Sequence, residues 1–323
     1  MSPFNLLFAQ AQPDGAREIV DHLARTPLSK VVVGVCVLSV IRLIVQPYLL
    51  RTAKHRRSGS YGFVQFTNEL LDSMIYAGVL VFMLIRPFGF QAFLIPTGSM
   101  WSQLHVNDFI LANKLIYRYT DPQAGDVVVF HPPTTSALLK TDLGADGEMK
   151  FDFVKRCIGV PGDLIEMKKG VVYRNGKVIE EPYQAYSVCI DNPNHCQEYR
   201  KLSPDEVKHV TKPSFKLVNL YGKLLPLNYT EMDANDPSPR VGDYAETSQP
   251  YHVALPFRLP NPSDQKTAVS LPAERIPKGM YLMMGDNRNN SYDGRAWGLV
   301  SREQIVGRSE FVWWPWSHIQ RTR

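Results

Sequence analysis

Two apolar segments near the start of the chain constrain its fold more than any other feature. "KVVVGVCVLSVIRLIVQPYLL" covers Lys30 to Leu50, and "LLDSMIYAGVLVFMLIRPFGF" covers Leu70 to Phe90. Each approaches the roughly 20 residues that a membrane-spanning helix needs. We therefore expect two transmembrane helices, at residues 30–50 and 69–90.

Arg42 lies within the first of these segments. A charge near the centre of a bilayer costs roughly 2.5 to 3.5 kcal/mol on insertion scales. The first segment therefore leaves an alternative open, an amphipathic helix buried in protein.

The loop between the two segments carries the charge that sets their orientation. "RTAKHRR", Arg51 to Arg57, contains four Lys/Arg residues. The positive-inside rule places such a loop on the cytoplasmic face, which puts both termini on the exported side. The start, "MSPFNLLFAQAQ", lacks the basic region of a cleaved secretory signal, so we expect the first helix to stay attached. The expected layout is a multi-pass protein of the cytoplasmic membrane, with an exported segment at 1–29, a basic cytoplasmic loop at 51–68 and an exported domain at 91–323.

The overall composition is that of an ordinary folded protein. The 323 residues are 44% hydrophobic, which suits one large domain or two modest ones and excludes a disordered or fibrous chain. A formal net charge of +5 is mild for this length, so we expect no nucleic-acid binding.

After Phe90 the pattern changes to short strand-like runs separated by Gly, Pro, Asn and Asp. Asn175-Gly176 is typical of a two-residue hairpin turn, because both central positions of that turn need positive φ. Residues 182–272 lack clear periodicity and predict a large inserted cap, and residues 134–150 predict a smaller exposed insertion. We expect a mainly antiparallel β domain, with strands in residues 125–130, 153–159, 170–179, 280–286 and 309–314.

Two of the four cysteines suit a disulfide. Cys189 and Cys196 flank the short polar loop "IDNPNH" outside the membrane, and the alternative is a pair of free thiols. No Cys/His spacing resembles a metal site and the eight histidines are scattered, so we expect no metal.

Three stretches could meet in space to form a catalytic site: Thr97-Gly98-Ser99, Lys155-Arg156 and "GDNRNNSYDGRAWG" from Gly285 to Gly298. No histidine accompanies them, which disfavours a Ser-His-Asp arrangement. A lysine can activate a serine instead, provided that burial lowers the lysine pKa from about 10.4 and leaves the amine neutral. Taken one at a time, the same stretches are compatible with ordinary turns and a surface lysine.

In the order of its motifs the chain resembles bacterial signal peptidase I, the membrane-anchored Ser/Lys endopeptidases of peptidase family S26. The resemblance rests on two helices around a basic loop, followed by "RPFGFQAFLIPTGSM", "GDVVVF", "VKRCIGVPGD" and "GDNRNNSYDGRAWG". It implies a β fold of the signal peptidase and repressor-autoprotease type. Residues from about 182 to 272 match no motif of the family.

The resemblance also implies a role for each matching residue. Ser99 corresponds to the nucleophile and Lys155 to the general base. Thr97 stands where the family usually has a serine whose hydroxyl joins the backbone N–H of Ser99 as an oxyanion hole. Ser291 corresponds to the serine that orients the lysine, and the supporting pair behind it corresponds to Asp293 and Arg295.

Four residues, at three places in the sequence, depart from the family pattern. Ser102-Gln103 replaces a usual Pro-Thr, Asn289 replaces a common aspartate and Gly294 replaces a common serine. These differences concern the shape of local loops and leave the Ser/Lys pair unchanged.

The activity implied by the resemblance is cleavage of signal peptides from exported preproteins after an Ala-x-Ala-like site, by acyl transfer and without a cofactor. The substrate would bind extended, with small side chains at its first and third positions before the cut. The implied partners are these preproteins and the lipid bilayer; we expect a monomer, and transient contact with the secretion translocon stays open. The apolar residues that match pocket positions are Phe93, Ile95, Met100, Leu104, Phe153 and Val154.

Two other functions remain open from the sequence. One is a specialised Ser/Lys processing peptidase of the same fold. The other is a catalytically silent, membrane-anchored binding module, which the joint presence of Ser99, Lys155 and Ser291 disfavours.

Overall fold

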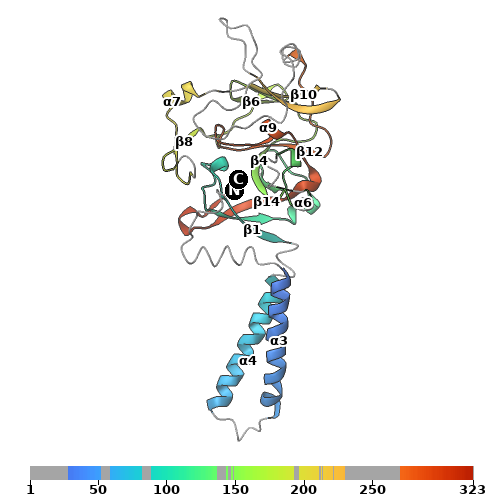
Figure 1. The fold of residues 1–323 in the computed structure, drawn as a ribbon, viewed down its shortest axis with the longest axis vertical. Helices are drawn as coiled ribbons and strands as arrows, with labels where there is room; N and C mark the ends of the chain where they lie inside the picture. Colours follow the sequence, from blue (N-terminus) through green and yellow to red (C-terminus); the bar gives the residue numbers. More distant parts are fainter. Residues whose placement is uncertain are drawn as a thin grey trace. The chain divides into compact units, whose positions relative to one another are not determined.

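The computed structural model describes the chain in two compact units (Figure 1). One contains the two N-terminal helices, and the other contains most of the chain from Phe93 onward. The described residues are 28–51, 59–81, 89–136, 143–144, 147, 149–192, 196–210, 212, 214–220, 222–229 and 270–322.

The helical unit consists of α3 (Leu28–Arg51) and α4 (Gly59–Gly78), which lie side by side. Within the described residues one helix, Ser29–Arg51 with a mean hydropathy of 2.0, is long and apolar enough to cross a membrane. Helix α4 begins at Gly59, so it starts inside the stretch predicted as the cytoplasmic loop and only overlaps the predicted span at 69–90. Most of the basic cluster, residues 52–57, and the end of that span, residues 82–88, lie outside the described residues.

Arg42 forms an ion pair with Asp72 of α4. The charge of Arg42, which raises the free energy of inserting the first apolar segment into a bilayer, therefore has a counter-charge on the neighbouring helix. This pairing offsets part of the cost of placing an arginine in an apolar helix.

The larger sheet of the β unit has eight strands in the order β1-β2-β14-β3-β4-β12-β13, with β15 paired to β14. Strand β3 pairs antiparallel with both β14 and β4, and β4 pairs antiparallel with β12. The mainly antiparallel β architecture predicted for this part of the chain is thus confirmed. The strands are β1 (Phe90–Leu94), β2 (Phe109–Asn113), β3 (Val127–Phe130), β4 (Phe153–Gly159), β12 (Met280–Met284), β13 (Val300–Ser301), β14 (Ile305–Trp314) and β15 (Gln320–Arg321).

A second sheet has the order β11-β10-β5-β6-β7, and β8 and β9 form a separate ribbon. The hairpin predicted at Asn175-Gly176 joins β6 and β7, and these two residues have φ values of 54° and 80°. The strands are β5 (Ile165–Lys168), β6 (Val171–Arg174), β7 (Lys177–Val178), β8 (Ser187–Cys189), β9 (Tyr199–Lys201), β10 (Ser214–Leu220) and β11 (Lys223–Tyr229).

The segment predicted as a cap at 182–272 is more integral than an appended insertion. Its strand β10 pairs with β5, and Phe215 and Leu217 are fully buried in one cluster with Ile165. In the smaller predicted insertion, Met149 is buried in another core cluster. Residues 230–269 of the predicted cap lie outside the described residues.

The two faces of β3 pack into different parts of the core. Val127 and Val129 belong to a cluster with Ile95, whereas Val128 and Phe130 belong to another. This alternation explains why the run "VVVF" is apolar at every position, since a strand covered on both faces needs apolar residues on both. The short helices are α6 (Ile116–Tyr119), α7 (Pro204–His209) and α9 (Gly294–Trp297), and the 3₁₀ turns are η3 (Gly98–Met100), η4 (Thr134–Ser136), η6 (Arg302–Gln304) and η7 (Trp316–His318).

Candidate active site

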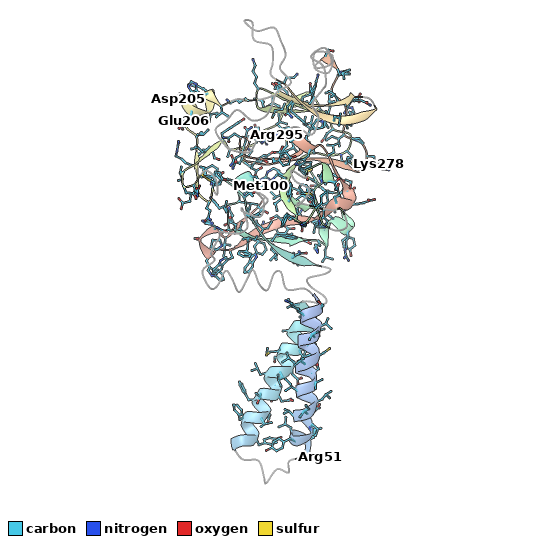
Figure 2. The ribbon with its side chains drawn as sticks, in the orientation of Figure 1. Arg51, Met100, Asp205, Glu206, Lys278 and Arg295 are labelled. Atoms are coloured by element: carbon cyan, nitrogen blue, oxygen red, sulfur yellow. A yellow bond between two sulfur atoms is a disulfide. The ribbon has the colours of Figure 1, made fainter. Side chains whose placement is uncertain are left out.

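Ser99 lies in the 3₁₀ turn η3, which is separated from the end of β1 by three residues and directly follows the extended residue Thr97. The turn is buried, and Ser99 is only 9% exposed. Asn287 holds this turn through two hydrogen bonds. Its side-chain amide donates to the Gly98 carbonyl (2.9 Å), and its backbone N–H donates to the Ser99 carbonyl (3.2 Å). Neighbouring Met100 and the more distant Arg295 are also buried in this unit (Figure 2).

Lys155 reaches Ser99 from the middle of β4. Its Nζ donates to Ser99 Oγ at 2.6 Å, and the residue is 5% exposed. Burial lowers the pKa of Lys155 from its ordinary value of 10.5 to about 8. The carboxylates of Asp293 and Asp286 act in the opposite direction, while Arg295 lowers the pKa further. The amine is thus close to the range in which it can accept a proton at moderate pH.

Thr97 lies on the same side as the serine hydroxyl. Its Oγ1 is 3.4 Å from Ser99 Oγ, with the geometry of a long hydrogen bond. Three of the residues singled out from the sequence, Thr97, Ser99 and Lys155, therefore meet at one point.

Asp293 and Arg295 form a buried bidentate ion pair. Arg295 donates to both carboxylate oxygens of Asp293, from Nε and from a terminal nitrogen, each at 2.8 Å. Burial alone would raise the pKa of Asp293, but the Arg295 charge and hydrogen bonds, with the Gly285 N–H, hold it below the ordinary value. Asp293 is also the N-cap of α9, where it accepts from the backbone N–H of Arg295.

Ser291 lies beside this pair and close to the turn that carries Ser99. A Cβ atom placed on Gly285 would be 2.1 Å from Ser291 Oγ and 2.5 Å from the Ser99 carbonyl, so only glycine fits between them. Ser291 Oγ is buried and, among the described residues, has no hydrogen bond of ordinary geometry, although it helps to lower the pKa of Asp293. The bond to Lys155 that the resemblance implied is therefore absent from this structure.

Two buried ion pairs were not predicted from the sequence. Arg156, next to Lys155, donates to both oxygens of Asp286 at 2.8 and 2.7 Å and lies 4.0 Å from the centre of the Tyr183 ring. Arg288 pairs in the same bidentate way with Glu181. Arg156, Asp286 and Arg288 lie inside quoted motifs, but nothing in their spacing indicated which partner each would take.

Asn289 gives a physical reason for one departure from the family pattern. Its side-chain oxygen accepts from the Ser187 N–H (2.9 Å) and its amide donates to the Ser187 carbonyl (2.8 Å). An ionised aspartate could accept but not donate, so the asparagine suits this reciprocal pair. Ser187 also donates to Asn287, which links the loop to β8.

Five of the six predicted pocket residues belong to one cluster. Ile95, Met100 and Leu104 are almost fully buried in it, and Phe93 and Val154 pack against it while partly exposed. Phe153 belongs to a different core cluster, although its ring lies 5.6 Å from Lys155 Nζ.

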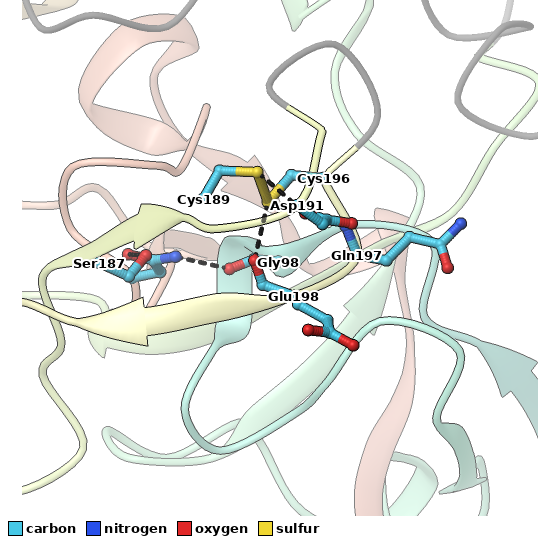
Figure 3. The surroundings of a disulfide bond; sticks show 8 residues. Gly98, Ser187, Cys189, Asp191, Cys196, Gln197 and Glu198 are labelled. Carbon is cyan, nitrogen blue, oxygen red and sulfur yellow. Dashed lines mark hydrogen bonds between the residues drawn. A yellow bond between two sulfur atoms is a disulfide. The ribbon is translucent and has the colours of Figure 1, made fainter.

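A disulfide joins Cys189, the last residue of β8, to Cys196, which lies in the segment before β9 (Figure 3). Tyr199 is the cross-strand partner of Cys189. The Tyr199 ring covers Gly98, because a Cβ atom there would be 2.1 Å from it. The disulfide-bonded ribbon is thus packed against the turn that carries Ser99.

The sequence is similar to those of known signal peptidases. The family described as "Signal peptidase, peptidase S26" matches residues 67–314. The chain is 28% identical over 247 residues to a probable signal peptidase I-2 of Synechocystis sp., covering 76% of this chain and 73% of that one. It is 32% identical over 278 residues to a signal peptidase I of Haemophilus influenzae (76% and 69% covered) and 28% identical over 250 residues to one of Bacillus amyloliquefaciens (77% and 86% covered).

Proposed function

The chain belongs to the peptidase S26 family of signal peptidases, and we propose that Ser99 and Lys155 carry out its cleavage of signal peptides. It is a hydrolase, a signal peptidase I, whose substrates are preproteins with signal peptides. The observation that supports the proposed pair is the 2.6 Å contact between Lys155 Nζ and Ser99 Oγ.

Lys155 acts first as the general base. Its neutral amine takes the proton of Ser99 as Oγ attacks the scissile carbonyl, and the protonated amine then passes that proton to the departing amine of the mature protein. The resulting ester between Ser99 and the signal peptide is hydrolysed by a water that the same amine deprotonates. The lowered pKa of Lys155 supports this role, because a lysine at its ordinary value would be almost entirely charged near neutral pH.

Thr97 and the backbone N–H of Ser99 form the oxyanion hole in this proposal. The developing oxyanion lies next to the attacking Ser99 Oγ, and the Thr97 hydroxyl is 3.4 Å from that atom. Such donors act most strongly in the transition state, where the negative charge develops.

Asp293 and Arg295 position the lysine indirectly. Their ion pair is buried. An oxygen of Asp293 accepts a hydrogen bond from the Gly285 N–H, and Gly285 lies against Ser291 and the Ser99 carbonyl. The ion-paired residues have opposite effects on the pKa of Lys155, which Asp293 raises and Arg295 lowers.

The substrate is proposed to bind extended, with small residues at its first and third positions before the cut. The partly exposed Phe93 and Val154 would contact those side chains, and the buried Ile95, Met100 and Leu104 would support them from behind. An extended peptide gains affinity from backbone hydrogen bonds and specificity from such side-chain contacts.

The protein is membrane-anchored, which fits the apolar helix at Ser29–Arg51. We further propose that α4 and the following residues form a second span and that the β unit is on the exported side. The Lys/Arg residues between Arg51 and Arg57 support this orientation.

Cleavage of a model preprotein by the purified full-length chain tests the proposal. Ser99→Ala should abolish processing, whereas Ser309→Ala, which changes a buried serine of β14, should leave it unchanged. Full cleavage by a folded Ser99→Ala protein would exclude Ser99 as the nucleophile.

A further inference from the structure

A cluster of two histidines and an aspartate lies outside the groups used for catalysis. His105 and Asp108 are in the loop between η3 and β2, and His318 ends η7 near the C-terminus. One ligand atom from each of the three side chains lies within 4.8 Å of the others.

Asp108 is held rigidly at the centre of this cluster. It is 0% exposed, and its Oδ2 accepts from the His105 backbone N–H at 2.8 Å. Its other oxygen lies 2.9 Å from His318 Nδ1, and its Oδ2 lies 3.7 Å from His105 Nδ1. Among the described residues, these two histidines are its only ion-pair partners, so the carboxylate faces imidazoles and no lysine or arginine.

The two imidazoles are arranged around the same point. Their ring centres are 4.7 Å apart, and His105 Nδ1 is buried and has no hydrogen-bond partner among the described residues. Both side chains are nevertheless 39% exposed, so the two imidazoles lie at the surface of the β unit.

We propose that His105, Asp108 and His318 bind a divalent transition-metal ion of the zinc type. Two ligands at roughly 2.0 to 2.2 Å from a tetrahedral zinc ion lie roughly 3.3 to 3.6 Å from each other. The two separations from Asp108, 2.9 Å from Oδ1 to His318 Nδ1 and 3.7 Å from Oδ2 to His105 Nδ1, lie on either side of that range. Imidazole ligands favour such ions over magnesium or calcium, which prefer oxygen.

The site is structural, because none of its ligands contacts Ser99 or Lys155. It joins the C-terminal segment to the loop that follows the turn carrying Ser99. Direct hydrogen bonds already link these segments, from the Gln320 side chain to the Gln103 carbonyl (2.7 Å) and from the Gln103 side chain to the Arg321 carbonyl (3.2 Å). A bound ion would strengthen the same connection. The spacing of residues did not reveal this cluster, because His318 is 210 positions from Asp108.

The test uses the full-length protein in detergent, without a polyhistidine tag and with Cys36→Ser to remove an exposed free thiol. Zn²⁺ binding is measured by calorimetric titration and by the shift in unfolding temperature. We expect one bound Zn²⁺ and a higher unfolding temperature. His318→Gln and His105→Gln should each weaken binding by at least about 100-fold, because even loss of a group behind a ligand costs roughly 10- to 100-fold.

His131→Gln is the matched control, because His131 also pairs with an aspartate, Asp152 at 2.5 Å, but does not belong to the cluster of His105, Asp108 and His318. It should leave Zn²⁺ affinity unchanged. Preprotein cleavage by each variant shows that it is folded. If one of the two ligand variants does not fold, the Zn²⁺ affinity of the other tests the proposal. The proposal is overturned if the parent protein takes up no Zn²⁺ at micromolar concentrations, if a folded ligand variant binds as tightly as the parent, or if His131→Gln weakens binding equally.

Discussion

At the residue scale, Lys155 is both buried and basic, and this combination determines how the activity should depend on pH. With a pKa of about 8, about one tenth of the amine is neutral at pH 7. Because the pKa is lowered, the neutral base is populated above pH 8 and lost as the pH falls. We expect kcat/KM to rise about tenfold per pH unit well below pH 8 and to level off above it. A rate profile between pH 5 and 10 measures this, and a flat profile through pH 8 would contradict it.

Substituting Lys155 separates its basicity from its charge. Arginine keeps a cation but is effectively never deprotonated, so Lys155→Arg should be as inactive as Lys155→Ala. Single-turnover cleavage of a model preprotein by both variants checks this, with thermal unfolding as the control for folding. Substantial cleavage by the arginine variant would remove Lys155 from the role of general base.

Thr97 provides a test of the oxyanion hole. Thr97→Val removes the hydroxyl and keeps the β-branched shape, so folding and KM should change little. Turnover should fall about 100- to 1000-fold, equivalent to roughly 3 to 4 kcal/mol. Thr97→Ser, which keeps a hydroxyl, should remain active. Steady-state kinetics on both variants decide the point, and a valine variant with parental turnover would leave the oxyanion to backbone donors.

The sequence predicted single residues better than pairs of residues. Ser99 and Lys155 could be predicted to approach one another because each lies in a motif and the motifs occur in family order. The partners of Arg156 and Arg288 could not be predicted, because the sequence contains many carboxylates that could pair with an arginine. Only the folded structure shows that Arg156 pairs with Asp286 and Arg288 with Glu181. Ser291 shows the same limit, because its position beside Gly285 depends on atomic distances that no spacing encodes.

At the element scale, strand prediction succeeded where strands are apolar and bounded by turn residues. Strand β4 spans Phe153–Gly159 as predicted, and the predicted run at 309–314 is the second half of β14. Strand β10 was missed because its alternation, "SFKLVNL", occurs within a segment rich in proline and polar residues. Its place in the core depends on pairing with the distant β5, which local periodicity does not reveal.

The β8–β9 ribbon gives a prediction at this scale. The disulfide closes a short loop, so replacing both cysteines with serine should lower the free energy of unfolding by about 2 to 3 kcal/mol. The folded variant should still cleave, because Asn287 and Lys155 hold the Ser99 turn independently. Chemical unfolding measures the loss, and Cys36→Ser, which changes a free cysteine, is the control. Two free thiols at Cys189 and Cys196 in non-reduced protein from the exported compartment would contradict the assignment.

At the scale of the whole molecule, the remaining question is which side of the membrane carries the β unit. The proposed topology puts the β unit on the exported side, where a signal peptide is cut, and the charged loop between α3 and α4 in the cytoplasm. The Arg42–Asp72 ion pair supports insertion of both helices, because their charges neutralise each other, whereas the orientation rests on the Lys/Arg residues of the loop.

Reporter fusions test this orientation directly. An alkaline phosphatase, active only after export, should be inactive when fused after Arg57 and active when fused after Arg323. Replacing Arg51, Lys54, Arg56 and Arg57 with glutamine should reduce the activity of the second fusion, because the loop then loses the charge that retains it in the cytoplasm. The same number of lysine-to-glutamine changes on the surface of the β unit should have little effect, since the rule applies to short loops near the ends of a span. An active fusion after Arg57 would place the loop outside, and the proposed topology would then be wrong even if Ser99 and Lys155 remain the catalytic pair.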